Sequence, residues 1–208
     1  PGVKPAEVLV IGGGAAGTEA ARMAIGVGAN VTIVDKDLNR LRALDALFGF
    51  HLKTLYSSSS NIEESIKTAD LVIGSVLIPG KMAPKLITRA MIQEMQPLSV
   101  FIDISIDQGG SSETSRPTTH DAPTYLVDDV VHYCVTNMPG ASAKTATIAL
   151  TNATMDYALM IANLGYKKAL SDNPGLRNGL NIAFGHVTNK HVAEDLGLKY
   201  FPADTFLT

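Results

Sequence analysis

The sequence has few cysteines and aromatic residues and no long hydrophobic run. It contains one cysteine, Cys134, and no tryptophan among its 208 residues. A disulfide framework within the chain is therefore excluded. No stretch of about 18 residues is apolar without a charge or a helix breaker, as a membrane-spanning helix would require. We expect a soluble, cytoplasmic protein with a hydrophobic core.

Clusters of basic residues are also absent. The 17 basic and 20 acidic residues give a formal net charge of −3, without a basic run that would bind a phosphate backbone. We therefore expect neither nucleic acid nor a membrane as a partner, and we predict no metal site. The 46% hydrophobic content suffices for one large domain, or for one domain with an additional segment. Because the chain begins with Pro1 rather than methionine, we expect it to be part of a longer polypeptide.

Strand and helix patterns alternate along the first two thirds of the chain. A β-rich run at 8–11, a helical pattern at 18–27 and a second run at 31–34 predict a βαβ unit. About six strands alternating with helices predict an α/β fold, a doubly wound parallel sheet of the Rossmann type. The other expected strands are 52–56, 71–76, 100–104 and 130–135, and the other expected helices are 38–47, 62–69 and 88–95.

The pattern changes after residue 141. A long helical pattern rich in alanine and threonine runs from Ser142 to its end at Gly165, and one short helix is expected at 190–196 among turn residues. We therefore predict a dinucleotide-binding domain at 1–141. The C-terminal segment at 142–208 is expected to belong to an incomplete substrate domain and to expose an apolar patch, or to bury it against another chain.

The stretch "VLVIGGGAAGTEAA" contains a glycine motif in the place where a dinucleotide binds. Gly12, Gly14 and Gly17 fit G-x-G-x-x-G between a strand and a helix. The first glycine allows a tight turn, the second lets backbone amides approach a pyrophosphate, and the third lets the helix pack closely on the strand. The positive end of the helix dipole would then face the phosphates.

An acidic residue follows at the expected distance. Asp35 ends the second strand, where its carboxylate can accept hydrogen bonds from both ribose hydroxyls of an adenosine and would repel a 2′-phosphate. This placement favours NAD over NADP as the cofactor.

Three loops rich in glycine, proline and polar residues follow later strands. They begin after Val76, after the strand at 100–104 and after Val135, and the second contains Asp107, Arg116 and His120. Ligands of doubly wound sheets gather at such carboxyl ends. Asp107 has the best claim to a chemical role, because burial after an apolar strand would perturb its pKa.

Long motifs identify a related family. "GVKPAEVLVIGGGAAGTEAARMA", "ADLVIGSVLIPGKMAPKLITRAMI", "IDQGGSSETSRPTTHDAPTY", "VVHYCVTNMPGA" and "ALTNAT" closely resemble the alanine dehydrogenase family, relatives of the pyridine-nucleotide transhydrogenase α subunit. The resemblance covers nearly the whole chain. It implies reversible oxidative deamination of L-alanine to pyruvate and ammonia through an imine, with NAD accepting the hydride, in an oligomeric enzyme.

The resemblance also implies roles for individual residues. Asp107, the aspartate of "IDQGG", would be catalytic, assisting a histidine in proton transfer and positioning water. The remaining implied residues contact NAD. The pyrophosphate would lie on Gly14, Ala15 and Gly17, beside the turn at Gly12, and the adenosine on Asp35 and Arg40, with Ser57 near the adenine. Val76 and Leu77 would cover the cofactor, Arg116 is a further contact, and the nicotinamide would be surrounded by Ile104, Ser105, Ile106, Asp107, Val135, Thr136, Asn137 and Met138.

The catalytic histidine of the family is missing from this chain. It lies in an N-terminal half that also binds the substrate, and none of the five histidines here lies in its motif. His120 and His132 are interpreted as ordinary surface or hydrogen-bonded residues, and Cys134 as a buried strand residue. Ser111 stands where cysteine commonly occurs in the family, and Asp129 replaces a usual glycine that would suit a positive φ.

Three functions remain open from the sequence. The resemblance favours the NAD-binding and C-terminal portion of an NAD-dependent alanine dehydrogenase, which would need its missing half for chemistry and could receive it from a separate polypeptide. The first alternative is a noncatalytic NAD-binding module. The second is a transhydrogenase-like component, although "DQGGSSETSRPTTH" matches the dehydrogenases better.

Overall fold

The computed structural model describes residues 2–207. Two compact units are present along the chain. The first contains the residues up to 78 together with 82–138, and the second contains 79–81 together with the residues from 139 on. The boundary predicted after residue 141 remains a prediction of domain organisation.

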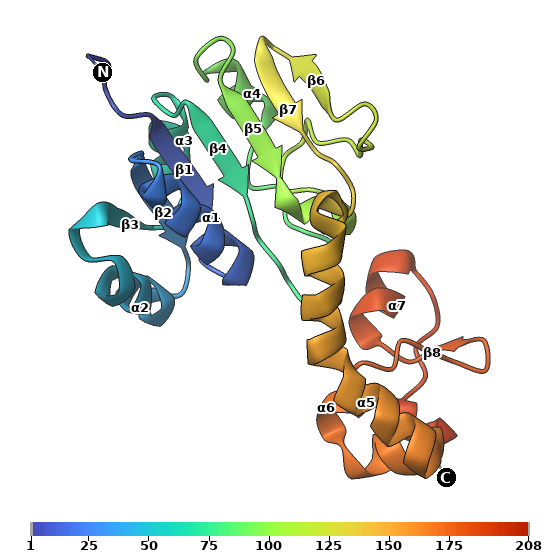
Figure 1. Cartoon of the computed structure of the whole chain (residues 1–208). Coiled ribbons are helices and arrows are strands. Elements are labelled where there is room, and N and C mark those ends of the chain that lie inside the picture. Colours follow the sequence, from blue (N-terminus) through green and yellow to red (C-terminus); the bar gives the residue numbers. More distant parts are fainter. Residues whose placement is uncertain (1, 208) are drawn as a thin grey trace. The chain divides into compact units, whose positions relative to one another are not determined.

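The first unit contains a seven-stranded sheet in the order β3-β2-β1-β4-β5-β7-β6 (Figure 1). All neighbouring pairs are parallel except β6 and β7. The predicted doubly wound α/β sheet is therefore confirmed. Its strands are β1 (Glu7–Ile11), β2 (Asn30–Asp35), β3 (Leu52–Tyr56), β4 (Leu71–Gly74), β5 (Val100–Asp103), β6 (Thr124–Val127) and β7 (Val130–Tyr133).

Strand β6 was missed in the sequence because its residues alternate only between exposed and half-buried positions. It forms an antiparallel hairpin with β7. The turn places Asp128 and Asp129 at φ values of 49° and 62°, in the left-handed region. The positive φ expected at position 129 is thus present, occupied by aspartate, which tolerates this region better than most residues.

The helices of this unit connect the parallel strands. The structure corrects the predicted start of the third helix from 62 to Ser59, because Ser58 accepts a hydrogen bond from the Asn61 N–H and caps it. The serine run at 57–60, between the predicted strand at 52–56 and the predicted helix at 62–69, therefore supplies the start of the helix. The helices are α1 (Ala15–Gly26), α2 (Leu38–Phe48), α3 (Ser59–Ile66) and α4 (Arg89–Gln93), with short 3₁₀ turns η1 (Gly49–His51) and η2 (Ile104–Gln108).

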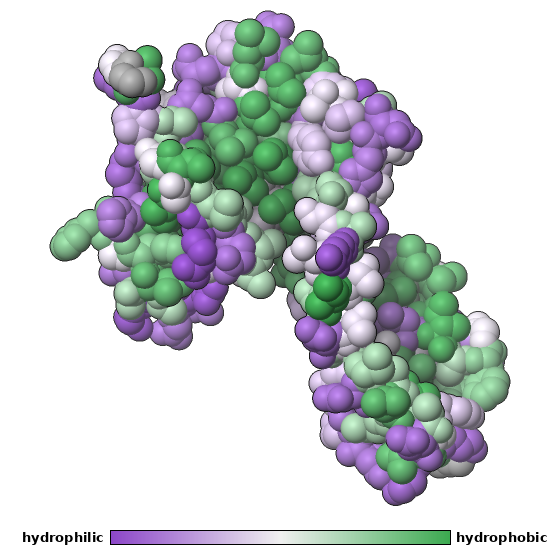
Figure 2. Space-filling view, in the orientation of Figure 1, coloured by the Kyte–Doolittle hydropathy of each residue, from purple (hydrophilic) through white to green (hydrophobic). Residues whose placement is uncertain are grey.

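Two hydrophobic clusters lie on opposite faces of the sheet because successive strand residues point to opposite sides. Leu9, Ile11 and Phe101 belong to the cluster that includes α3 and α4 residues. Val10 and Ile33 belong to the cluster that includes α1 and α2 residues. The second cluster is less covered at β5, β7 and the start of η2, where Ile102, Tyr133 and Ile104 are only half-buried. Figure 2 shows hydrophobic residues gathered over this part of the sheet.

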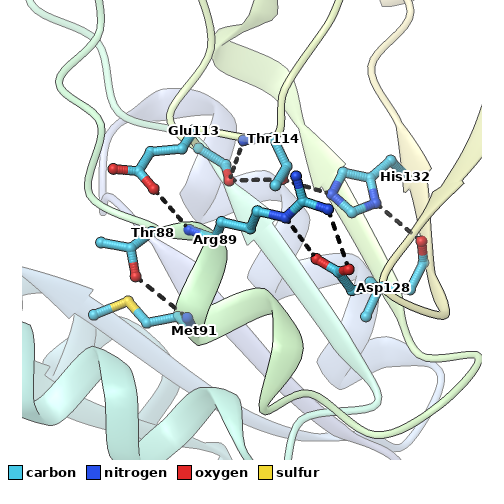
Figure 3. A network of polar contacts seen from close by, with 9 residues as sticks. Thr88, Arg89, Met91, Glu113, Thr114, Asp128 and His132 are labelled. Carbon is cyan, nitrogen blue, oxygen red and sulfur yellow. Dashed lines mark hydrogen bonds and ion pairs between the residues drawn. The ribbon is translucent and has the colours of Figure 1, made fainter.

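A polar network lies around the buried His132 (Figure 3). The His132 Nδ1 is 3.0 Å from the Val130 carbonyl oxygen, and Nε2 is 2.8 Å from the Thr114 hydroxyl. Because a carbonyl only accepts, Nδ1 carries the proton and Thr114 donates to Nε2. The Arg89 guanidinium donates to the Asp128 carboxylate at 3.0 Å, and the Arg89 N–H donates to Glu113. The network ties α4 to the β6–β7 turn and supports a neutral, core histidine.

The second unit begins with the short 3₁₀ turn η3 (Met138–Ser142) and a long helix, α5 (Ala143–Asp172). The helix predicted to end at Gly165 does break there, because Gly165 has the non-helical angles φ 73° and ψ 155°, and a second helical stretch continues from this kink to Asp172. The unit continues through α6 (Pro174–Asn178), the hairpin of β8 (Ile182–Ala183) and β9 (His186–Val187), α7 (Lys190–Leu196) and η4 (Ala203–Phe206).

Helix α5 exposes many hydrophobic side chains. Its buried residues are Ala169 and Leu170, near its C-terminal end. The predicted exposure of apolar surface is therefore present within residues 2–207. None of the helices in this range is long and apolar enough to cross a membrane. The exposed hydrophobic residues of α5 are Ile148, Leu150, Met155, Tyr157, Leu159, Ile161, Leu164 and Tyr166.

The buried His132 predicts a pH dependence of stability. Burial lowers the pKa of His132 below its usual value. As the pH falls below about 6.5, the unfolded chain protonates this histidine while the folded chain keeps it neutral, so the free energy of unfolding decreases. The free energy of unfolding is measured with urea at pH about 7.5 and about 5.5, on either side of the usual histidine pKa. It should decrease less between these two pH values in His132→Gln than in the parent. The exposed His51 provides the control, and an equal effect of His51→Gln would contradict this assignment.

Candidate functional site

The predicted cofactor residues follow the carboxyl ends of the parallel strands in the first unit. Strand β1 lies between β2 and β4, where the order of the sheet reverses, and Ile11 pairs with both Val34 and Gly74. Gly74 in turn pairs with Asp103. The loops after these strands therefore start side by side at one edge of the sheet, which is where dinucleotides bind in this architecture.

The glycine motif forms a tight turn between β1 and α1. Gly12 has φ 103°, and its N–H donates to the Val34 carbonyl at 2.9 Å. A Cβ atom on Gly17 would lie 1.9 Å from the Gly12 carbonyl oxygen and 2.6 Å from the Ser75 Oγ. The helix can start this close to the turn only without a side chain at Gly17. A Cβ on Gly14, by contrast, would meet nothing within 4 Å.

The N-terminus of α1 suits an anionic ligand. Its cap residue is Gly14, no side chain caps the helix, and its first turn contains no acidic residue. Backbone N–H groups at the start of such a helix are free to bind phosphate oxygens, with the helix dipole in their favour. The residues present therefore fit the pyrophosphate of a dinucleotide.

Asp35 lies against this turn. Its Oδ2 accepts a hydrogen bond from the Gly13 N–H at 2.6 Å, and its Oδ1 accepts one from the Asp37 N–H at 2.8 Å. The carboxylate thus orients the glycine turn in addition to the ribose contact expected for it. Each oxygen has a second lone pair for a ligand hydroxyl.

Arg40 reaches the same turn from α2. Its Nη2 donates to the Thr18 hydroxyl at 2.6 Å, and its Nε donates to the Gly13 carbonyl. The Thr18 hydroxyl in turn donates to the Gly14 carbonyl at 2.7 Å, which connects Arg40 to the start of α1. The structure therefore brings Asp35 and Arg40, both predicted to contact the adenosine, together at Gly13.

The loops after β4 and β5 are joined by hydrogen bonds. The Ser105 hydroxyl donates to the Val76 carbonyl at 2.8 Å, and the Ala83 N–H donates to the Gln108 carbonyl at 2.8 Å. The Lys85 ammonium donates to the Gly109 carbonyl. The two loops, which include the predicted residues Val76 and Ser105, are therefore held together by hydrogen bonds.

Asp107 projects from η2 toward the loop after β7. The Asn137 N–H donates to its two carboxylate oxygens at 3.2 and 3.3 Å, and Asn137 itself has φ 51°. The Asn137 carbonyl lies 3.2 Å from the His120 Nε2. The expectation that Asp107 is buried is wrong: its side chain is exposed, because η2 turns it away from the sheet. The buried aspartate is Asp103, at the end of β5.

Arg116 contacts a different part of the unit. Its guanidinium lies 4.0 Å from the centre of the Tyr125 ring on β6, and its N–H donates to the Tyr125 hydroxyl. The same hydroxyl lies 3.4 Å from the Cys134 sulfur. Burial raises the pKa of both Tyr125 and Cys134. Cys134 is fully buried, so its interpretation as a core residue is confirmed.

Other predicted residues lie along the same edge. Ser57 follows β3 and is buried, and its N–H donates to the Asp35 carbonyl. Leu77 is exposed, while Val135 is buried beside the start of the last loop. Within residues 2–207, no three His, Cys, Asp or Glu side chains are grouped as metal ligands would be.

Three residues of this edge were not singled out from the sequence. Thr18 and Ser75 tie the glycine turn to its neighbours, Ser75 by donating to the Gly12 carbonyl at 2.8 Å. Asp103 accepts hydrogen bonds from the loop that carries Asp107. Only Asp103 leaves a signal in the sequence: it ends an apolar strand run four residues before Asp107 in "FIDISIDQGG".

Comparison with known proteins assigns the family. A family model described as alanine dehydrogenase/PNT, C-terminal domain, matches residues 1–190. The chain belongs to this family. Its Rossmann-type sheet and its family imply a nicotinamide cofactor.

Two curated alanine dehydrogenases are similar over the whole chain. The enzyme of Bacillus subtilis is 56% identical over 208 residues, and that of Halomonas elongata is 53% identical over 207 residues. The chain covers 55% of the first protein and 56% of the second. It therefore spans about half the length of the relatives it matches, as the resemblance had implied.

Solved structures agree with this assignment. An L-alanine dehydrogenase is 47% identical, with a TM-score of 0.84 over 95% of this chain and 54% of that one. A transhydrogenase from Sinorhizobium meliloti is 30% identical, with a TM-score of 0.63 over 70% of this chain and 41% of that one. Both dehydrogenase and transhydrogenase relatives thus share the fold.

The close approach at Gly17 predicts a large effect of one methyl group. Gly17→Ala should lower the free energy of unfolding by about 1–3 kcal/mol or more, because its Cβ would overlap backbone atoms that cannot move aside easily. Chemical denaturation measures this change. Gly26→Ala is the matched control in the same helix, since a Cβ there meets nothing within 4 Å. It should be neutral or stabilising by up to about 1 kcal/mol, and equal effects of the two changes would refute the packing argument.

Proposed function

We propose that the chain is the NAD-binding portion of an NAD-dependent L-alanine dehydrogenase. Its enzyme would carry out the reversible oxidative deamination of L-alanine to pyruvate and ammonia. The observation that carries the proposal is the identity of more than half of the residues with alanine dehydrogenases over the whole chain. The site at the sheet edge supports it, because turn, helix start and acidic residue all fit a dinucleotide.

The choice of NAD rests on Asp35. Its carboxylate lies at the end of β2 beside the glycine turn, and a 2′-phosphate placed there would meet a negative charge. The Arg40 side chain is held by hydrogen bonds to the Thr18 hydroxyl and the Gly13 carbonyl, so it is less free to turn toward a 2′-phosphate. The pyrophosphate would lie on the N–H groups at Gly14, Ala15 and Gly17.

The nicotinamide would lie between the loops after β4, β5 and β7, where bound NAD supplies a hydride acceptor. We assign the contacts to Val76, Leu77, the segment 104–107 and the segment 135–138. Asp107 is the catalytic residue of this chain: its exposed carboxylate can accept a proton or orient water, while the Asn137 N–H keeps it in place. Ser57 and Arg116 are assigned to the adenine side and to the rim of the site.

The active site of the proposed enzyme is completed outside this chain. The family resemblance places the catalytic histidine and the groups that bind the substrate carboxylate in the N-terminal half, which this chain does not span. A cytoplasmic, oligomeric enzyme fits the family, with the exposed apolar residues of α5 available for contacts with other chains or segments.

A mixing experiment tests the proposal. Alanine-dependent reduction of NAD is measured with the purified chain alone and after addition of the separately expressed N-terminal half of the Bacillus subtilis enzyme. Activity only on mixing supports the proposed function. NADH binding without activity in either case would favour a noncatalytic NAD-binding module, and hydride exchange between nicotinamides would favour a transhydrogenase component.

NADH binding by the chain should depend on Asp35. Asp35→Asn removes a charge-assisted hydrogen bond to the ribose and weakens binding by about 1.5 to 3 kcal/mol, as measured by NADH fluorescence titration. Asp45→Asn, which changes the same charge on the exposed side of α2, is the control and should leave the affinity unchanged. Unchanged affinity in Asp35→Asn would overturn the placement of the cofactor.

Asp107 should matter for turnover and not for binding. Asp107→Asn keeps the side-chain shape but removes the group that takes up a proton, so the complemented enzyme should lose alanine-dependent NAD reduction by about 100-fold or more. Its affinity for NADH should stay within about twofold of the parent, because no charge is lost from the phosphate or adenosine contacts. Full turnover in Asp107→Asn would remove this residue from the catalytic role.

A further inference from the structure

The carboxylate of Asp103 is enclosed by its own loop. Asp103 ends β5 and is 0% exposed. Its Oδ1 accepts hydrogen bonds from the Ser105 N–H at 3.0 Å and the Ser111 hydroxyl at 3.1 Å. Its Oδ2 accepts hydrogen bonds from the Ser111 N–H at 2.7 Å and the Ser115 hydroxyl at 2.5 Å. All four donors are neutral, and all follow Asp103 within the same loop.

These bonds join the two ends of the segment that carries Asp107. Ser105 lies at the start of η2, and Ser111 lies just after the two glycines that follow it. Between these anchors, Gly109 and Gly110 have φ values of 90° and 80°, and the Gly110 N–H donates to the Ser105 carbonyl. The carboxylate therefore closes a compact loop in which the position of Asp107 is fixed from both sides.

The surroundings leave the carboxylate little room to move. A Cβ on Gly110 would lie 2.9 Å from Asp103 Oδ2, and a Cβ on Gly74 would lie 3.4 Å from Oδ1 and 2.1 Å from the Ser111 Oγ. Ser111, at the position where the family commonly has cysteine, thus donates a hydrogen bond from its hydroxyl to Asp103. A buried carboxylate with four donors is held in one geometry, because rotating it would break several of these hydrogen bonds at once.

We propose that Asp103 is a positioning residue that holds the Asp107 carboxylate against the Asn137 N–H. The inference rests on the proposed function only in naming Asp107 as the catalytic group. Asp103 itself is buried, and the four hydrogen bonds that its carboxylate accepts all come from its own loop. It acts by fixing both ends of the loop that presents Asp107, in the manner of residues that support a catalytic group from behind.

The substitution Asp103→Asn tests this role with almost no change in shape. Oδ1 and Oδ2 each accept from a backbone N–H, at Ser105 and Ser111 respectively. An asparagine offers one accepting oxygen and one donating amide, so either orientation leaves one of these N–H groups facing a donor. One end of the loop is therefore released. Ser115→Ala is the matched control, because it removes a hydroxyl donor and keeps both backbone hydrogen bonds.

The readout is the chemical shift of the Asn137 backbone amide in the full chain, measured by two-dimensional NMR. Asp107→Asn should shift this resonance in the parent, because it removes the carboxylate that the N–H contacts. In the Asp103→Asn background, the shift caused by Asp107→Asn should fall to about half or less. In the Ser115→Ala background it should keep its full size. Thermal unfolding of each variant is recorded alongside.

The outcomes separate positioning from stability alone. The proposal would be overturned if Asp103→Asn lowered the stability while Asp107→Asn still shifted the Asn137 resonance by its full amount. It would also be overturned if Asp103→Asn changed neither the stability nor this shift. If Asp103→Asn does not fold, the same comparison is made with Asp103→Glu, which keeps the charge but displaces it by one methylene. An undiminished Asn137 shift in that variant would also overturn it. Because no turnover or NADH is involved, failure here is distinct from failure of the proposed function.

Discussion

The contact between the start of α1 and the Gly12 carbonyl determines how the other residues are placed at the edge of the sheet where the predicted cofactor residues lie. It exists because Gly17 has no side chain, and a single methyl group would lie 1.9 Å from that oxygen. The approach brings the helix N-terminus to the end of β1. Ser75, Thr18 and Asp35 then fix the turn through hydrogen bonds to its carbonyl and amide groups. Close backbone packing at Gly17 makes this arrangement possible, and hydrogen bonds from polar side chains stabilise the turn in that position.

A second level of order lies in the loops beyond the strands. Those after β4, β5 and β7 are positioned by backbone and side-chain hydrogen bonds together with buried hydrophobic residues such as Ile87, Ile106 and Val135. Asp103 and Asp107 illustrate two uses of one residue type. Four donors enclose the first carboxylate, whereas the second faces outward with one N–H contact and is open to a reacting partner.

Much of the fold could be predicted from the sequence, because buried parallel strands such as β1 and β4 have continuous apolar runs and the glycine motif marks the first turn. The antiparallel strand β6 could not, since neither of its faces is fully buried. The candidate site residues came from the glycine pattern and from long family motifs. The exposure of Asp107 and the enclosure of Asp103 depend on how η2 turns, and both aspartates follow the same apolar run.

The environment of Cys134 has a practical consequence. The thiol is fully buried, it lies beside the Tyr125 hydroxyl, and burial raises its pKa, so little thiolate forms at neutral pH and reagents have no access to it. No other cysteine occurs in the chain. A cysteine introduced at an exposed position would therefore be alkylated alone. Fluorophores or spin labels can be attached at one chosen site without first replacing the native residue.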